Sequence, residues 1–253
     1  MTEDTFEAII LGGGTSARMQ FEEKMPKQLL PVHNQKSMLQ YQIEWLKRFH
    51  IKDIVMAIDM ASYNYILDNV PYLLKMANAS VETEKLGTGG ALKKAIELVK
   101  GNIVYVMNVD DFIVSDVYVP SDLIDSLASG FNISILTSRG RFPYGIIRSR
   151  GSRVTRFDQK PLMDYKVSAG HYAIRTKAIR DYFPDIGDFE TSLMAELASK
   201  KEVTFMDLDG KWITANTYKE FKIAKREIEA YEIRMRYGTD ARGFKGYGRN
   251  FYS

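Results

Sequence analysis

The chain contains no cysteine among its 253 residues, and this absence excludes several kinds of site. Without a thiol there is no disulfide bond, no thiolate ligand for a metal and no cysteine nucleophile. A chain of this composition fits a reducing compartment, and the acidic N-terminal stretch "MTEDTFEAII" lacks the pattern of a secretory signal peptide. We therefore expect a cytoplasmic protein.

Histidine is scarce as well, because the sequence holds only His33, His50 and His171. Their spacing matches neither a metal site nor a nucleophile paired with a base, so we expect structural roles for all three. Long apolar runs are also missing. No run approaches the roughly 18 residues that span a bilayer, so we expect no association with a membrane.

Excess charge of either sign is small. The 35 Lys and Arg residues and 32 Asp and Glu residues leave a net charge of +3. This falls short of the basic stripe typical of nucleic-acid binding, so we expect no nucleic-acid partner. Hydrophobic residues make up 45% of the chain, enough for one large core. We predict one domain over residues 1–235 and an extension rich in Gly, Arg and aromatic residues over 236–253.

Strand-like and helix-like patterns alternate over the first 110 residues, which favours parallel strands connected by helices. Strands are predicted at 6–11, 51–58, 80–84 and 102–109, with helices at 37–50, 61–77 and 87–99 between them. After residue 130 come short strand-like runs at 131–138, 144–150, 153–159 and 167–175, typical of an antiparallel patch. Helices at 176–184, 189–199 and 217–235 and a strand at 203–208 follow. The sequence therefore predicts an α/β fold with a Rossmann-like, mainly parallel sheet and a small antiparallel sheet.

A loop with three consecutive glycines follows the first predicted strand. Gly12, Gly13 and Gly14 allow the backbone to approach a ligand closely and to point successive amides at phosphate oxygens. The loop matches neither the G-x-G-x-x-G fingerprint nor a P-loop. Arg18 and Lys27 add two cations that can embrace a triphosphate. A glycine turn flanked by solvated charges is the alternative interpretation.

The segments "LGGGTSARM" and "KMPKQLLPV" resemble the signature loop of the sugar-1-phosphate nucleotidyltransferases, written L-A-G-G-x-G-T-R-L and then P-K-x-L-L-P-V. The loop departs from that signature at Gly12, Ser16, Ala17 and Met19. Six further segments are similar to family elements and occur in the family's order: "ETEKLGTGGALKKA", "VMNVDDFI", "RVTRFDQKP", "VSAGHYAI", "DFETSLMAELA" and "GKWITANTYKEF". The chain is thus identified as a member of this family up to about residue 225.

The resemblance implies the GT-A-like nucleotidyltransferase fold, with the small antiparallel sheet binding the sugar. It also implies two substrates, a nucleoside triphosphate and a sugar 1-phosphate, with Mg²⁺ as cofactor. Arg18 and Lys27 would serve the triphosphate, and Lys160 would hold the sugar phosphate. The matched nucleotide-binding positions are Leu11, Gly12, Gly13, Gly14, Glu82, Gly87 and Thr88, and the matched sugar-binding positions are Gly145, Gln159, Ser168 and Gly170.

Asp110 is the expected metal ligand, because it follows an apolar strand at the sheet edge where α/β proteins bind ligands. Strand alternation turns Asp111 to the opposite face, although a turn beginning there could bring both carboxylates to the metal. A helix cap is the alternative role for either aspartate. The family's second metal aspartate falls at Thr214 or Asn216, and we expect Asn216 to contact the metal through its carbonyl oxygen.

The choice of base is indicated by Glu82, which matches a glutamate common in guanylyltransferases for mannose or heptose phosphates. A carboxylate accepts hydrogen bonds from the N–H donors of guanine, so GTP is favoured. The segment "KWITANTYKEF" resembles cytidylyltransferases, so CTP stays open, and UTP is a further possible substrate. An inactive member that senses nucleotide sugars and an unrelated α/β binding module are the alternatives, and a homo-oligomer is compatible with the sequence.

Overall fold

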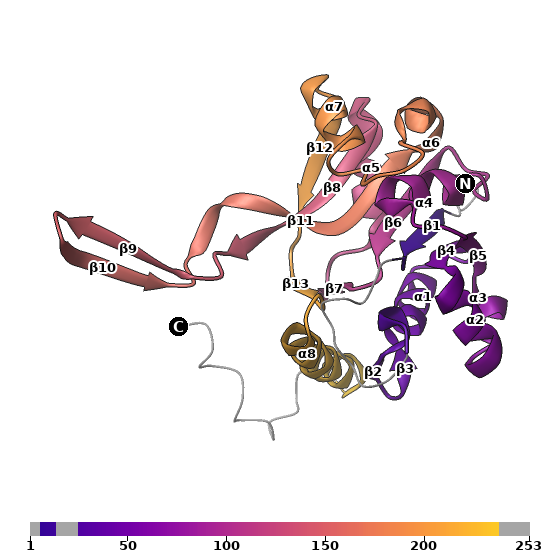
Figure 1. Cartoon of the computed structure of the whole chain (residues 1–253), viewed down its shortest axis with the longest axis horizontal. Coiled ribbons are helices and arrows are strands. Elements are labelled where there is room, and N and C mark those ends of the chain that lie inside the picture. Colours follow the sequence, from indigo (N-terminus) through magenta and orange to yellow (C-terminus); the bar gives the residue numbers. More distant parts are fainter. Residues whose placement is uncertain (1–5, 14–24, 238–253) are drawn as a thin grey trace.

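A computed structural model describes residues 6–13 and 25–237 of the chain. Its centre is a seven-stranded sheet with the strand order β12-β8-β11-β6-β1-β4-β5. The strands β1, β4, β5 and β6 run parallel to one another and make up one half of the sheet (Figure 1). Their bounds are Glu7–Leu11 for β1, Ile54–Asp59 for β4, Asn78–Glu82 for β5 and Ile103–Asn108 for β6.

Helices cover both faces of this parallel half, as its continuous apolar strands require. In β1 the side chains alternate, so Ala8 and Ile10 join the core beneath helix α1 (Met38–Arg48) whereas Ile9 and Leu11 pack toward α4 (Gly87–Ile96). Helix α1 begins where the Ser37 hydroxyl accepts a hydrogen bond from the backbone N–H of Gln40, at 3.1 Å. Two separate apolar cores result, one on each face of the sheet.

The helix predicted at 61–77 is two helices, α2 (Met60–Asn69) and α3 (Leu73–Met76). Pro71 lies between them and cannot donate the backbone hydrogen bond that a continuous helix needs at that position. Three other helices complete the middle of the chain: α5 (Pro120–Asp125), α6 (Thr176–Ile179) and α7 (Leu193–Ser199). The last two are shorter than the sequence predicts.

The other half of the sheet is antiparallel. Strand β11 (Leu162–Arg175) runs antiparallel to β6 on one side and to β8 (Ile133–Arg141) on the other, and β12 (Val203–Asp207) continues parallel to β8. The fold class predicted from the sequence is confirmed, with one difference in detail. The predicted strands at 131–138 and 167–175 belong to the main sheet rather than to a separate patch, since β11 pairs directly with β6.

Three two-stranded sheets lie outside the central sheet: β2 with β3, β7 with β13, and β9 with β10. Their bounds are Pro31–His33, Lys36–Ser37, Asp111–Val114, Lys211–Thr214, Gly145–Arg150 and Arg153–Gln159. The hairpin β9–β10 projects away from the body (Figure 1), and we call residues 145–159 the arm. The last described helix, α8 (Tyr218–Tyr237), packs beside β2 and β13. Within the described ranges no helix is long and apolar enough to cross a membrane.

Candidate functional site

The glycine loop and the aspartate turn, defined as residues 109–111, leave the sheet at the same edge. Strands β1 and β6 are parallel neighbours, and Leu11 lies opposite Asn108 in their register. The backbone N–H of Val109 donates to the carbonyl of Leu11 at 3.0 Å, so the two loops are joined where the strands end. Carboxyl ends of parallel strands are the usual place for ligands in such sheets. The predicted nucleotide loop and the predicted metal aspartate therefore share one edge.

Three side chains predicted from distant segments meet at this edge. The Lys27 ammonium lies 2.5 Å from Oδ2 of Asp110 and donates to Oδ1 of Asn216 at 3.4 Å. The amide of Asn216 donates in turn to the hydroxyl of Thr214, at 2.7 Å. Of the two positions proposed for the second metal ligand, Asn216 is thus the one whose oxygen faces the same cation as Asp110. The Lys27 and Asp110 side chains are only 16% and 18% exposed, which strengthens their attraction.

The neighbouring carboxylate, Asp111, is buried and accepts hydrogen bonds from inside the protein. Trp212 donates to its Oδ1 at 2.8 Å and Asn108 donates to its Oδ2 at 3.0 Å, and the residue is only 6% exposed. Burial, and then the nearby charge of Asp110, raise the pKa of Asp111 to about 7. The geometry thus gives the adjacent aspartates different surroundings, one facing Lys27 and one buried among hydrogen-bond donors.

The backbone of the aspartate turn is fastened by two buried side chains that the sequence did not indicate. The Gln42 amide donates to the carbonyl of Val109 at 3.2 Å and to that of Asp111 at 2.8 Å. Nε2 of His171 lies 3.0 Å from the same Asp111 carbonyl, which can only accept. The carbonyls of Val109 and Asp111 are thereby satisfied by buried side chains, and that of Asp110 accepts from the backbone N–H of Ala215 at 2.9 Å, so the position of the turn is fixed.

His171 is itself part of a buried polar chain. Its Nδ1 lies 2.6 Å from the Tyr105 hydroxyl, which lies 2.9 Å from the Tyr118 hydroxyl. His171 has no exposed surface, and burial lowers its pKa to about 4, so the ring is neutral at physiological pH. The predicted structural role fits this geometry.

Gly170 and Ser168, both predicted at the sugar site, lie against the buried aspartate. Gly170 has a φ of +71°, and a Cβ atom there would lie 2.0 Å from Oδ2 of Asp111, so only glycine fits. The Ser168 hydroxyl donates to the Tyr172 hydroxyl at 3.0 Å and accepts from the Gly170 N–H at 3.2 Å. These positions are therefore joined to the aspartate turn by direct contact.

Glu82, the predicted base reader, lies at the end of β5 against the glycine loop. A Cβ atom on Gly13 would lie 2.5 Å from its Oε1, and the backbone N–H of Leu86 donates to its Oε2 at 3.1 Å. The loop itself continues the sheet, since the N–H of Gly12 donates to the carbonyl of Ala57 at 2.8 Å. Glu82 is 8% exposed, and burial raises its pKa.

Gly87 and Thr88 open helix α4 and contact a later acidic segment. Gly87 has a φ of +75°, and a Cβ atom there would lie 2.6 Å from the carbonyl oxygen of Gly187. The Thr88 hydroxyl donates to Oε2 of Glu190 at 2.9 Å, and its backbone N–H donates to Oδ1 of Asp188 at 3.2 Å. Two carboxylates that we did not predict as site residues are thus placed at the start of α4.

Lys160 lines a pocket of about 350 Å³ together with Trp212 and Thr214. Trp212 donates to Asp111, and Thr214 accepts from Asn216. Its backbone has a φ of +48°, which is uncommon for a residue with a side chain. The guanidinium of Arg141 donates to the Lys160 carbonyl at 3.2 Å, which supports this conformation. Lys160 is therefore close to the β13 side of the site.

The two remaining sugar-site predictions, Gly145 and Gln159, lie opposite each other in the register of the arm. They are the first residue of β9 and the last residue of β10, at the end of the arm opposite its turn, whereas Ser168 and Gly170 lie in β11 of the main sheet, where Gly170 is close to Asp111. The four predicted positions thus form two separate pairs.

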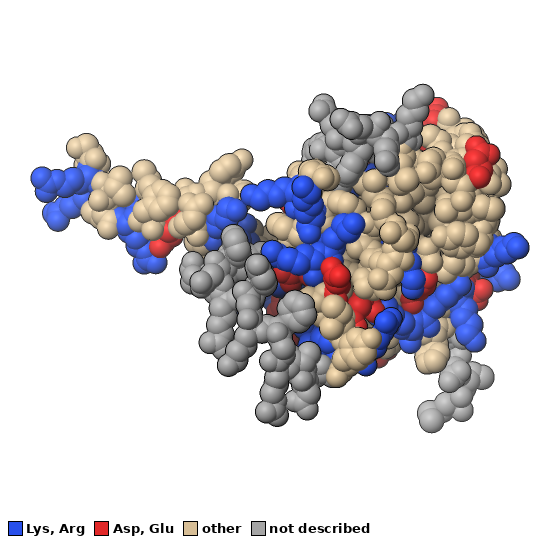
Figure 2. Space-filling model, turned by 90° about the horizontal axis from the view of Figure 1, so that it is seen from below, with Lys and Arg blue, Asp and Glu red and all other residues tan. Residues whose placement is uncertain are grey.

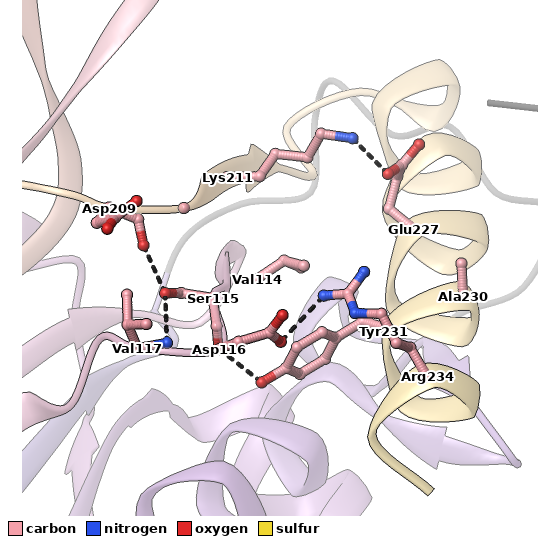
Figure 3. Close-up of a pocket in the computed structure, with 11 residues that line it drawn as sticks. Val114, Ser115, Asp116, Val117, Asp209, Lys211, Glu227, Ala230, Tyr231 and Arg234 are labelled. Carbon is pink, nitrogen blue, oxygen red and sulfur yellow. Dashed lines mark hydrogen bonds and ion pairs between the residues drawn. The ribbon is translucent and has the colours of Figure 1, made fainter. Parts of the chain in front are cut away.

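A second pocket of about 420 Å³ lies between helix α8, strand β13 and the end of β7 (Figure 3), and ion pairs beside it join the helix to these segments. Lys211 of β13 is paired with Glu227 at 2.5 Å, and Arg234 is paired with Asp116 at 3.1 Å. None of the predicted site residues lines this pocket. The pocket is lined by Lys211 of β13, the strand that also contains Trp212 of the aspartate site.

The predictions for Gly14 and Arg18 lie outside the described residues. Within the part of the chain that the structure describes, no group of three or more His, Cys, Asp or Glu side chains could hold a metal. The oxygens of Asp110 and Asn216 do converge on one cation, the Lys27 ammonium. They could hold a divalent ion only if a ligand supplied most of its coordination.

Curated relatives are named for one activity. The chain is 38% identical over 111 residues to a D-glycero-alpha-D-manno-heptose 1-phosphate guanylyltransferase of Campylobacter jejuni, covering 42% of this chain and 48% of the relative. It is 29% identical over 234 residues to a mannose-1-phosphate guanyltransferase of Debaryomyces hansenii, covering 85% of this chain and 62% of the relative. The chain thus spans about half to three fifths of the length of these relatives.

Solved structures share the fold. HddC of Yersinia pseudotuberculosis, complexed with GMP-PN, superposes with a TM-score of 0.66 at 19% identity, covering 88% of this chain and all of that one. The family model described as nucleotidyl transferase matches residues 7–213, from the start of β1 to β13. This match confirms the resemblance of the sequence motifs, and the chain belongs to the nucleotidyl transferase family.

Proposed function

We propose that the chain transfers a nucleotidyl group from a nucleoside triphosphate to a sugar 1-phosphate and releases pyrophosphate. A phosphate oxygen of the sugar phosphate forms a bond to the α-phosphorus, and the bond from that phosphorus to the pyrophosphate oxygen breaks. The attacking phosphate is already ionised near neutral pH, so no side chain needs to remove a proton. The protein's contribution is positioning and the neutralisation of charge.

The observation that carries the proposal is the meeting of Lys27, Asp110 and Asn216 beside the glycine loop. A lysine next to a phosphate-binding backbone suits a triphosphate, and the paired oxygens suit a cation that accompanies it. Lys160, which shares a pocket with Thr214, is suited to the phosphate of the sugar. The two lysines approach the site from different segments, so each can serve a different substrate.

Mg²⁺ is the proposed cofactor, and Asp110 and Asn216 are the residues that would hold it. One carboxylate and one amide oxygen give a site that depends on the triphosphate for its remaining ligands, which is usual for this ion. When bound, the ion would offset the negative charge of the phosphates. Asp111 would support Asp110 from beneath, since its own oxygens already accept from Asn108 and Trp212.

GTP is the proposed nucleotide, in line with the guanylyltransferase names of the relatives. Glu82 uses Oε2 to accept from Leu86, and its Oε1 faces Gly13 of the loop. An ionised carboxylate held in this way can accept hydrogen bonds from the adjacent N–H donors of guanine, which uracil cannot offer in the same way. The cytoplasmic location expected from the sequence stays a prediction.

A screen for pyrophosphate release tests the proposal. The purified chain is incubated with Mg²⁺, each of the four common nucleoside triphosphates and a panel of sugar 1-phosphates. We expect release with GTP and a hexose or heptose 1-phosphate. Binding of nucleotide sugars without turnover of any pair would instead support the sensor alternative, and neither binding nor turnover would overturn the nucleotidyltransferase proposal.

The same screen with Glu82→Gln tests the choice of base. The amide cannot accept two hydrogen bonds from adjacent donors as a carboxylate does, so GTP turnover should fall at least roughly tenfold, the loss of about one charge-assisted hydrogen bond. The lead of GTP over UTP should narrow. An unchanged ratio between the two nucleotides would show that Glu82 does not select the base.

A further inference from the structure

Ser168 is an exposed residue of strand β11, yet its hydroxyl already makes two hydrogen bonds within the protein. It donates to the Tyr172 hydroxyl at 3.0 Å and accepts from the backbone N–H of Gly170 at 3.2 Å. A serine hydroxyl has one proton and two lone pairs. The proton and one of the lone pairs are therefore in use, and only the second lone pair is left for a ligand.

The proton of Tyr172 decides the direction of this bond, because two hydroxyls can otherwise exchange the roles of donor and acceptor. Tyr172 is only 2% exposed, so its hydroxyl must find its partners inside the protein. Burial raises the pKa of Tyr172, the hydrogen bond from Ser168 lowers it, and the nearby charges of Glu190 and Asp111 raise it again. Of these two carboxylates, Glu190 is the one that hydrogen-bonds to Tyr172, so the tyrosine proton points to Glu190 and the tyrosine oxygen accepts from Ser168.

Both Glu190 and Tyr172 are held in place by the start of helix α4 and the segment packed on it. The Thr88 hydroxyl donates to Oε2 of Glu190 at 2.9 Å and accepts from the backbone N–H of Phe189 at 3.2 Å. The Phe189 ring in turn contacts Tyr172 edge-on, with the ring centroids 4.9 Å apart. The direction of the Ser168 hydrogen bond is thus set by a carboxylate that is fastened to the nucleotide side of the site.

The remaining lone pair of Ser168 does not suit the phosphate of a sugar 1-phosphate. An ionised phosphate offers only acceptors, so it cannot bond to a lone pair. Cations suit the phosphate instead, and basic side chains lie along the arm and where the arm joins the body (Figure 2). Lys160, which directly follows β10 of the arm, is the cation proposed for that phosphate. What Ser168 can bind is therefore a donor on the sugar ring.

We propose that Ser168 is a specificity-determining residue that acts only as an acceptor, so it selects a sugar with a hydroxyl or amino group at the ring position facing it. Tyr172 and Glu190 impose this direction and are positioning residues. The proposal rests on the function proposed above, because it takes the bound ligand to be a sugar 1-phosphate. A sugar whose group at that position only accepts, such as fluorine or a methoxy group, leaves the serine lone pair unpaired and is rejected.

Monodeoxyfluoro analogues of a hexose or heptose 1-phosphate that the chain turns over give the first test, one ring position at a time. Fluorine is close to a hydroxyl in size but has no proton to donate. The fluorine penalty is the kcat/KM of the parent sugar divided by that of the analogue. At the position facing Ser168 it should be at least roughly tenfold, because a buried hydrogen bond loses its donor. Ser168→Ala should remove the penalty at that one position and keep it at any other. An unchanged set of penalties in Ser168→Ala would overturn the proposal.

Tyr172→Phe tests the direction of the hydrogen bond, because it frees the Ser168 proton to turn toward the sugar. The penalty at the same ring position should then fall at least roughly threefold, since the serine no longer needs a donor. The matched control is Tyr231→Phe, which removes another buried tyrosine hydroxyl, one that donates to the Ser115 carbonyl at 2.8 Å, and should keep the wild-type penalty. Each penalty compares two substrates on one preparation, so partial loss of folded protein cancels.

The outcomes separate this proposal from the function on which it rests. A wild-type penalty in Tyr172→Phe, or an equal fall in both tyrosine variants, would overturn the direction assigned to the Ser168 bond. If no sugar 1-phosphate is turned over, the proposed activity fails, and calorimetric binding of the same analogues then makes the same comparison for a chain that only binds. Absence of binding as well would overturn both.

Discussion

The aspartate turn and the arm are two connections of the chain that are held in opposite ways. In the turn, the backbone carbonyls of Val109 and Asp111 accept hydrogen bonds from buried side chains, and the carboxyl of Asp111 accepts two more. In the arm, two strands pair with each other and their side chains on both faces reach solvent. The conformation of the turn is held by the side chains packed beneath it, whereas that of the arm depends only on the pairing of its own two strands.

This difference separates the expected effects of substitutions. A change in the turn must disturb a buried, satisfied network, so it should alter catalysis or the free energy of unfolding. A change in the arm meets mainly solvent, so it should leave the body unchanged. Four sets of substitutions, taken in order of decreasing effect, test this difference.

Asp110→Asn should have the largest effect, because it removes the charged oxygen that accepts from Lys27 beside Asn216. We expect turnover to fall at least roughly 100-fold, the scale for losing one charge-stabilising group at a reacting centre. The free energy of unfolding should fall as well, because both side chains are mostly buried and the substitution removes the ion pair between them.

Steady-state rates at saturating Mg²⁺ and urea unfolding of the same preparation provide the measurement. Asp111→Asn is the matched control. Because the Asp111 side chain is buried, this substitution should lower the free energy of unfolding more than the turnover rate. If Asp111→Asn abolished turnover at full stability while Asp110→Asn stayed active, the assignment of the metal ligand would be wrong by one residue.

Gly170→Ala in the body should lower the free energy of unfolding more than Gly151→Ala in the arm. Both glycines have positive φ, +71° and +60°, so both alanines meet the same kind of backbone strain, about 1 kcal/mol. At Gly170 the new Cβ would also collide with Oδ2 of Asp111, whereas at Gly151 nothing lies within 4 Å. We expect a total of about 3 kcal/mol or more at Gly170 and about 1 kcal/mol at Gly151. Urea unfolding measures both, and equal losses would contradict the contact.

The contrast between the buried turn and the exposed arm could be predicted only in part from the sequence. The parallel strands, the glycine loop and Asp110 follow from apolar runs that end in glycine or aspartate. Asn108, Trp212 and the histidine after Gly170 stand inside motifs that we matched, but the pattern does not say that they converge on Asp111. That convergence depends on the pairing of β13 with β7 and of β11 with β6, which are long-range contacts.

Other parts of the site had no local signal at all. Gln42 lies in the middle of a helix, where a polar residue normally faces water, and only the packing of α1 under the aspartate turn buries it. The arm was visible as two strand-like runs, but strand patterns do not show whether a hairpin joins a sheet or leaves it. Sequence therefore indicates which segments carry chemistry, and tertiary packing decides which side chains meet.

Lys27→Ala and Lys160→Ala test whether the two lysines divide the substrates. Lys27 lies with Asp110 beside the glycine loop, and Lys160 lies in the pocket with Trp212 and Thr214. Loss of a charge-assisted phosphate contact costs about 1.5 to 3 kcal/mol, or roughly 10- to 150-fold. The KM for the triphosphate should rise mainly in the first variant, and the KM for the sugar phosphate mainly in the second. Steady-state kinetics with each substrate varied in turn measures this, and equal rises in both variants would refute the division.

His171→Gln should change how stability depends on pH, the smallest effect of the four. Burial lowers the pKa of His171 to about 4 in the folded chain, against 6.5 when unfolded. The unfolded chain therefore binds the proton first as the pH falls. The contribution of the neutral ring is complete above about pH 6.5 and is lost progressively toward pH 4. At pH 5.5 this loss amounts to about 1.4 kcal/mol relative to high pH.

Urea unfolding at pH 7.0 and pH 5.5 provides the measurement, as the difference between wild type and variant. The raised pKa of Asp111 has the opposite effect, because its contribution to stability is lost as the pH rises. Asp111 is present in both chains, so its contribution cancels in that difference. The glutamine keeps a donor for the Asp111 carbonyl but cannot take up a proton, so the variant should lose less stability on acidification. Phe157→Ser, in the arm, should follow wild type at both values. If His171→Gln kept the wild-type pH dependence of stability, the His171 ring would not be held neutral beneath the turn. The electrostatic argument for the contrast between turn and arm would then fail.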